Sequence, residues 1–147
     1  MTSPAILLIE DNPDDQALTL RALKKNNILN PVTVVGDGAE ALDYLLPADG
    51  ADRADGVGAE LPGLILLDLK LPKVDGLEVL RRVRANERTQ IIPVVVLTSS
   101  KLDEDVIASY RNGANAYVRK PVKFSDFVEA ISTLGVFWLL LNEAVPD

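Results

Sequence analysis

The chain has no cysteine and no histidine among its 147 residues. Without cysteine it can form neither a disulfide framework nor a thiolate metal site. Without histidine it has no Ser-His-Asp or Cys-His catalysis, no imidazole metal ligand and no histidine of its own to carry phosphate. Any chemistry of this protein must therefore depend on carboxylates, hydroxyls, amines and main-chain groups.

Positive charge is also scarce. Fifteen lysines and arginines stand against 22 acidic residues, which gives a formal net charge of −7. An acidic surface repels phosphate backbones, so we expect no direct binding of nucleic acid. No apolar run reaches the roughly 18 residues of a transmembrane helix, and the start, Met1-Thr2-Ser3-Pro4, lacks the basic residues of a signal peptide. These features predict a cytoplasmic protein without membrane contact.

What the chain does have is an alternation of short apolar runs and amphipathic segments. The most informative run is Leu64-Ile65-Leu66-Leu67, which lies between Pro62-Gly63 and Pro72 and leads into Asp68. A continuous apolar run bounded by such breakers is typical of a strand buried on both faces. By the same reasoning we expect strands over 5–9, 31–36, 64–67, 91–97 and 116–118. We expect helices over 13–27, 38–46 and 77–86, from a capping box at 100–103 to a C-cap at 112–113, and from 125 onward.

This order repeats a strand and a helix five times. Such alternation favours parallel pairing through right-handed crossovers, with helices on both faces of the sheet. The sequence therefore predicts one α/β domain with a doubly wound, five-stranded parallel sheet of flavodoxin-like order 2-1-3-4-5. In this fold, ligands bind outside the carboxyl ends of the strands, where the strand order reverses.

The segment 47–62 differs in composition from the rest of the chain, because it is rich in small, polar and turn-forming residues. It predicts an exposed loop before the third strand. Asp49, Asp52 and Asp55 are spaced by three, whereas a calcium-binding EF-hand loop needs acids at alternate positions and a glutamate at the twelfth. The spacing therefore argues against a calcium loop.

Polar residues stand at the carboxyl ends of four expected strands: Glu10 and Asp11, Asp68, Thr98 and Lys120. Three neighbouring carboxylates repel one another, and a hard divalent cation such as Mg²⁺ would relieve that repulsion. Lys120 adds a positive charge that could pair with Asp68. An aspartate can form an acyl phosphate, and phosphoryl transfer needs mainly positioning and charge stabilisation. The set predicts a phosphoryl-transfer site with Asp68 as the nucleophile.

The same residues resemble the receiver domain of two-component response regulators. The resemblance covers about residues 5–134. We therefore assign residues 1–134 to a receiver domain. It implies that Asp68 accepts a phosphoryl group from a phosphohistidine of a sensor histidine kinase, so that the protein is a signalling phosphoacceptor and not an enzyme. The motifs that carry it are Ile9-Glu10-Asp11, the stretch from Leu67 to Gly76, Leu97-Thr98-Ser99 and the stretch from Tyr117 to Pro121.

The resemblance also implies a metal site. Mg²⁺ would be bound by Asp11, by Asp68 and by the backbone carbonyl of Lys70, with Glu10 acting through water. The Glu10-Asp11 pair stands where Asp-Asp is more common in the family.

A conformational switch is implied as well. Thr98 and Tyr117 match the pair in which the hydroxyl moves toward the phosphoryl group and the aromatic ring turns inward. Lys120 matches the lysine that contacts the phosphoryl group, and the Lys120-Pro121 bond is often cis in the family.

The last thirteen residues, 135–147, form an apolar extension around Phe137, Trp138, Leu140 and Leu141. A terminal segment that is apolar on all sides must be buried somewhere. It could fold back on its own core, but we expect a homodimer contact with the aromatic residues as anchors. The tail, the 47–62 loop and the overall length are also similar to small stand-alone regulators of phytochrome histidine kinases, which implies a phytochrome partner.

Three alternatives remain open from the sequence. The kinase partner could be a sensor kinase other than a phytochrome. The chain could be a pseudo-receiver that binds partners without phosphorylation, although the acid pair, Asp68, Thr98 and Lys120 argue against this. A phosphatase of the haloacid dehalogenase kind would need a second acid two residues after the nucleophile, and that position holds Lys70.

Overall fold

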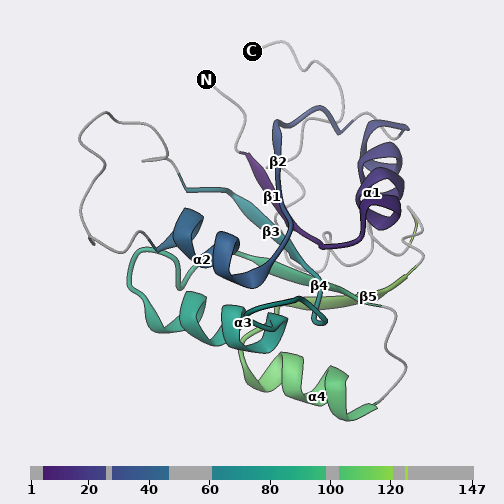
Figure 1. The fold of residues 1–147 in the computed structure, drawn as a ribbon. Helices are drawn as coiled ribbons and strands as arrows, with labels where there is room; N and C mark the ends of the chain where they lie inside the picture. Colours follow the sequence, from purple (N-terminus) through teal and green to yellow (C-terminus); the bar gives the residue numbers. More distant parts are fainter. Residues whose placement is uncertain (1–4, 26–27, 47–60, 99–102, 121–124, 126–147) are drawn as a thin grey trace, which may run out of the picture.

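The computed structural model describes residues 5–25, 28–46, 61–98, 103–120 and 125. Its centre is a five-stranded sheet of order β2-β1-β3-β4-β5 in which every neighbouring pair is parallel (Figure 1). The predicted α/β class and strand order are confirmed. The strands are β1 (Ile6–Ile9), β2 (Val32–Val35), β3 (Leu64–Leu67), β4 (Val94–Thr98) and β5 (Ala116–Arg119).

Helices cover both faces of the sheet, as predicted. Figure 1 shows α1 on one side and α2, α3 and α4 together on the other. Two separate clusters of buried side chains follow this division: one contains Leu23 of α1, and the other contains Leu42 of α2 and Leu80 of α3. The helices are α1 (Pro13–Lys25), α2 (Gly38–Leu45), α3 (Gly76–Ala85) and α4 (Asp103–Arg111).

The central strands β1 and β3 are buried on both faces. All eight of their residues are at most 1% exposed, because alternate side chains enter the two clusters. The register aligns Ile9 with Leu67, and the amide of Asp68 continues the ladder by donating to the Ile9 carbonyl at 3.0 Å. The residues that follow the two strands, Glu10 and Asp68, are therefore brought to the same edge of the sheet.

The fourth strand begins later than the sequence predicts. The expected span 91–97 is wrong at its start, since β4 begins at Val94 and the Ile91 side chain is 85% exposed. Local hydrogen bonds compete with the strand there: the Thr89 hydroxyl donates to the Val83 carbonyl at 2.7 Å, and the Ile92 amide donates to the Thr89 carbonyl at 3.0 Å. Pro93 has no amide hydrogen to extend the ladder, so pairing starts after it.

Arg84 of α3 joins the segments at the amino end of β4 and β5. Its guanidinium donates to four acceptors: the carbonyls of Gly113 and Gln90 at 2.9 Å each, the carbonyl of Ile92 at 2.6 Å, and Asn115 Oδ1 at 2.6 Å. Partial burial lowers the pKa of Arg84 from its usual value. We call this arrangement the Arg84 clamp; it lies at the end of the sheet opposite Asp68.

Several predicted features lie outside the described residues. These are the calcium-like acids of the 47–62 loop, residues 100–102 of the capping box, the Lys120-Pro121 bond, the last helix apart from Ser125, and the 135–147 extension. Within the part of the chain that the structure describes, no helix has the length and apolar character needed to cross a bilayer.

Candidate functional site

The carboxyl ends of β1 and β3 hold a cluster of three acids. Glu10 and Asp68 are buried, Asp11 is exposed, and one carboxylate oxygen from each lies within 4.8 Å of the others. The strand register explains this convergence for Glu10 and Asp68, because each directly follows a central strand. The sequence prediction that residues 58 positions apart would meet is correct in its geometry.

Lys120, the first residue after β5, points into the acid cluster. Its ammonium donates to Glu10 Oε1, to Asp68 Oδ2 at 3.1 Å and to Asp15 Oδ2 at 2.9 Å. The lysine side chain is only 10% exposed, so these contacts are shielded from solvent. The expected pairing of Lys120 with Asp68 is present, and it is shared with two further carboxylates.

The electrostatics of the cluster shift two groups in the same direction. Burial raises the pKa of Glu10 to about 7; the Lys120 ammonium and the Asn12 amide oppose this shift, while the nearby Asp68 charge adds to it. Burial would lower the pKa of Lys120, but its carboxylate partners outweigh burial and raise that pKa above its usual value. Lys120 therefore keeps its positive charge, and burial makes the Glu10 carboxylate easier to protonate than an exposed glutamate.

The loop after β3 places the backbone of Lys70 against the nucleophile candidate. The Lys70 amide donates to Asp68 Oδ1 at 3.2 Å, and the Gly76 amide returns to the Leu69 carbonyl at 2.8 Å. A Cβ on Gly76 would lie 2.3 Å from the Asp68 carbonyl oxygen, so only glycine permits α3 to start this close to the loop.

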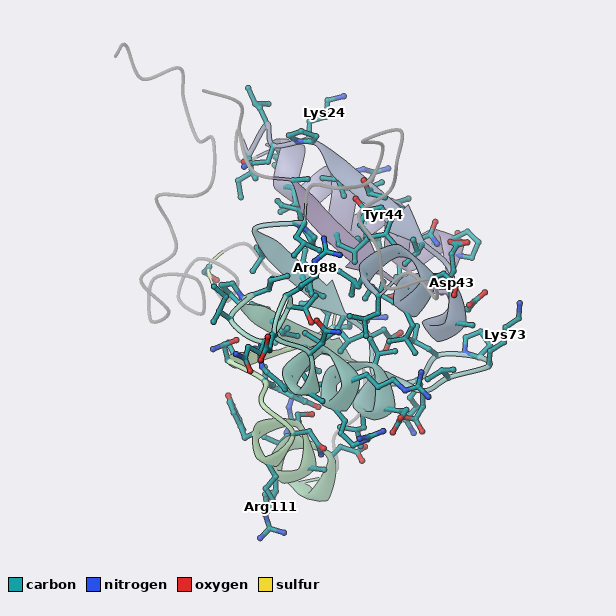
Figure 2. The ribbon with its side chains drawn as sticks, turned by 90° about the vertical axis from the view of Figure 1, so that its left-hand side faces the viewer. Lys24, Asp43, Tyr44, Lys73, Arg88 and Arg111 are labelled. Atoms are coloured by element: carbon teal, nitrogen blue, oxygen red, sulfur yellow. The ribbon has the colours of Figure 1, made fainter. Side chains whose placement is uncertain are left out.

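Lys73 in the same loop has a left-handed backbone, with φ of 68°. Its side chain extends from the outer edge of the molecule (Figure 2), and its ammonium lies 3.5 Å from Asp37 Oδ2. Asp37 is the N-cap of α2 and accepts from the Glu40 amide at 2.7 Å. The loop that begins at Asp68 is thus tied to the start of α2 as well as to α3.

The two expected switch residues lie on neighbouring strands. Thr98 is the last residue of β4, at the same edge of the sheet as Asp68; the structure describes its backbone and not its side chain. Tyr117 of β5 pairs with Val96 and packs, partly buried, against the core under α2 and α3. Burial raises the pKa of the Tyr117 hydroxyl, so it remains protonated at neutral pH.

Asp15 is the site residue that the sequence reasoning missed. From the sequence alone, it is an acid in the first turn of α1 that complements the helix dipole. Its place in the first turn of α1 gives no signal of this role, because the contact with Lys120 spans 105 residues of sequence. Asn12 fixes this turn, since its Oδ1 accepts from the amides of Asp14 at 2.8 Å and Asp15 at 3.2 Å.

The donor set fits a hard divalent cation. Three carboxylates with oxygens this close repel one another when ionised, and carboxylate oxygens are the ligands that Mg²⁺ prefers. The whole sequence has no cysteine and no histidine, and its single methionine is Met1. The cluster can thus hold Mg²⁺ beside a buried aspartate that faces an ammonium.

Comparison with known proteins gives one consistent family. The sequence model of the response regulator receiver domain family matches residues 6–132 of this chain. The probable methanogenesis regulatory protein FilR2 of Methanothrix harundinacea is 40% identical over 139 residues, which cover 95% of this chain and 86% of FilR2. The response regulator Rcp1 of Synechocystis is 38% identical over 134 residues, covering 91% of this chain and 88% of Rcp1.

Solved structures agree with this comparison. The bacteriophytochrome response regulator AtBRR is 52% identical, with a TM-score of 0.82 and coverage of 97% of this chain and 100% of AtBRR. The phosphorylated cyanobacterial phytochrome response regulator RcpA is 35% identical, with a TM-score of 0.74 and coverage of 99% and 100%. The Mn²⁺-bound form of Rcp1 is 37% identical, with a TM-score of 0.72 and coverage of 97% of each chain.

Proposed function

Because this chain belongs to the response regulator receiver family, we propose that Asp68 is its phosphoacceptor and that a sensor histidine kinase supplies the phosphoryl group. The observation that supports this most directly is the setting of Asp68. It is a buried carboxylate at the carboxyl end of β3, with the Lys120 ammonium 3.1 Å from one oxygen and the Lys70 amide 3.2 Å from the other.

In the proposed step, a carboxylate oxygen of Asp68 attacks the phosphorus of a phosphohistidine on the kinase. The P–O bond to Asp68 forms as the P–N bond breaks, and the electron pair stays on the imidazole, which takes up a proton. Lys120 offsets negative charge on the transferred group. The Lys70 amide holds Asp68 Oδ1 in place before the reaction.

Mg²⁺ is the cofactor that we assign to the acid cluster. Asp11, Asp68 and the backbone carbonyl of Lys70 would hold it, with Glu10 acting through water, and it would neutralise charge on the transferring phosphoryl oxygens. The mutual distances of the three acids support the metal site, and the Mn²⁺-bound structure of Rcp1 is a precedent in a similar protein.

Signalling would pass through Thr98 and Tyr117. Thr98 ends β4 at the edge that carries Asp68, so a hydroxyl there suits a hydrogen bond to a phosphoryl oxygen. Tyr117 is partly buried on the adjacent strand, where it packs against the edge of the core. We assign these two residues to the switch that converts phosphorylation into a changed surface near α4 and β5.

A phytochrome histidine kinase is the partner class that we favour. Support comes from the similarity to AtBRR, a bacteriophytochrome response regulator, and to RcpA, a cyanobacterial phytochrome response regulator. FilR2, at 40% identity, is described as a methanogenesis regulatory protein, so a kinase of another kind is the alternative.

Phosphotransfer from a purified phytochrome kinase tests the acceptor and the partner class together. The parent protein should become labelled and Asp68→Asn should not. Asp43→Asn, a change of an exposed acid on α2, should label like the parent. Labelling of Asp68→Asn would contradict the acceptor assignment.

The same preparation separates the rival functions. Steady turnover of a phosphomonoester would favour a phosphatase. A parent protein that shows no Mg²⁺-dependent response to beryllofluoride, a phosphoryl mimic, would be a pseudo-receiver.

We also propose that the 135–147 extension forms a homodimer contact through Phe137, Trp138, Leu140 and Leu141. The support is compositional, because these apolar side chains follow the segment matched by the family model. Deletion of 135–147 should convert a dimer to a monomer in light scattering. An unchanged mass would refute the contact.

A further inference from the structure

Asp15 has a contact that its place at the surface of α1 does not require. Its Oδ2 accepts from the Lys120 ammonium at 2.9 Å, across 105 residues of sequence. Its neighbour Asp14 offers a direct comparison. Both acids lie in the first turn of α1, and both have their amides bonded to Asn12 Oδ1, but Asp14 is exposed and forms no ion pair with the residues that the structure describes. Helix capping therefore explains the pair of acids, and only Asp15 reaches the site.

The contact uses up the donors of Lys120. An ammonium has three N–H groups, and the three carboxylates of Glu10, Asp15 and Asp68 each accept one hydrogen bond. A phosphoryl group on Asp68 needs a donor from the same ammonium. Asp15 therefore competes with the phosphoryl group for Lys120, while its negative charge attracts a cation to the cluster and repels an anion from it.

We propose that Asp15 is a positioning residue that sets the balance of the site between cation and anion: it holds Lys120 toward α1, strengthens the binding of Mg²⁺ and weakens the hold on the phosphoryl group. The proposal rests on the function proposed above, because it assumes that Asp68 and Lys120 receive the phosphoryl group. It assigns Asp15 no contact with the reacting atoms, since Asp15 acts through Lys120 and through its charge.

The two ligands give opposite predictions for an uncharged residue at position 15. In Asp15→Asn, the dissociation constant for Mg²⁺ should rise about three- to fivefold, as expected for loss of one partly exposed charge. At saturating Mg²⁺, the dissociation constant for beryllofluoride should fall by a similar factor. A purely structural role would weaken both, so the opposite signs are the diagnostic result.

Isothermal titration calorimetry on the full chain measures both constants. Asp14→Asn is the matched control: it removes the same charge from the same helical turn and should change neither constant by more than about 1.5-fold. Asp15→Ser provides a second uncharged variant and should reproduce the opposite changes. Unequal far-UV circular dichroism would identify a variant that does not fold.

Other patterns in the folded variants overturn the inference. One is a rise in both dissociation constants, for Mg²⁺ and for beryllofluoride. The other is no change in either constant relative to Asp14→Asn. Failure of the function proposed above has a separate signature. In that case the parent protein would not bind beryllofluoride, or Asp68→Asn would bind it as the parent does.

Discussion

Replacing Glu10 by glutamine should remove most of the pH dependence of Mg²⁺ binding. Burial raises the pKa of Glu10 to about 7, so in the metal-free protein this carboxylate gains a proton within the physiological range. A dication beside Glu10 favours the ionised form, and proton and metal therefore compete.

The size of the effect follows from the pKa. With a pKa of about 7, roughly ten of every eleven molecules carry the proton at pH 6, so the apparent affinity there should fall below its high-pH limit by at most about tenfold. At pH 8 the loss should be only about 10%. The sign is fixed by competition: affinity rises with pH through about 7 and then levels.

Calorimetric titration with Mg²⁺ from pH 5.5 to 8.5 at constant ionic strength would measure this curve. Glu10→Gln should bind Mg²⁺ more weakly at pH 8 and show a nearly flat profile over this range. Glu87→Gln, a change of an exposed glutamate far along the chain, should keep the parent curve. A slope near pH 7 that survives in Glu10→Gln would refute the assignment of the titrating group.

Two further substitutions test the framework that supports the site. Arg84→Lys keeps the positive charge but loses the planar guanidinium and most of its hydrogen bonds, so the free energy of unfolding, measured by urea titration, should fall by about 2 kcal/mol. The control Arg82→Lys, at an exposed position, should change that free energy by less than about 0.5 kcal/mol. Equal effects would contradict the clamp. Gly38→Ala would put a Cβ 1.8 Å from the Val74 carbonyl oxygen and should cost about 2 kcal/mol or more, whereas Gly36→Ala meets nothing within 4 Å and should be nearly neutral in the same titration. A neutral Gly38→Ala would show that the loop after Asp68 moves easily.

The sequence was informative where one physical pattern dominated. Continuous apolar runs such as Leu64–Leu67 identify strands buried on both faces, and alternation with helices then determines the parallel order. Since carboxyl ends of parallel strands share one edge, the meeting of Glu10, Asp11 and Asp68 follows from the topology.

Where patterns competed, the sequence was less informative. Ile91 and Ile92 extend an apolar run, but hydrogen bonds of Thr89 and the missing amide of Pro93 delay the strand to Val94. Asp15 is an acid of the kind often found at the start of a helix. Its contact with Lys120 arises only when the folded chain brings α1 close to the end of β5. The Arg84 clamp could not be predicted either, because most of its acceptors are main-chain carbonyl oxygens, which every residue type carries.

The Arg84 clamp has a consequence for how such a protein can diverge. Three of its four acceptors are backbone carbonyls, which every amino acid provides. The exposed side chain at Gln90 can therefore change without removing a bond to the guanidinium, provided the backbone keeps its path. Ile92 is held by its burial in the core, and Gly113 by its positive φ and by the contact that a Cβ would make with Arg84. Of the three carbonyl positions, only Gln90 is free to acquire a new recognition feature without disturbing the clamp.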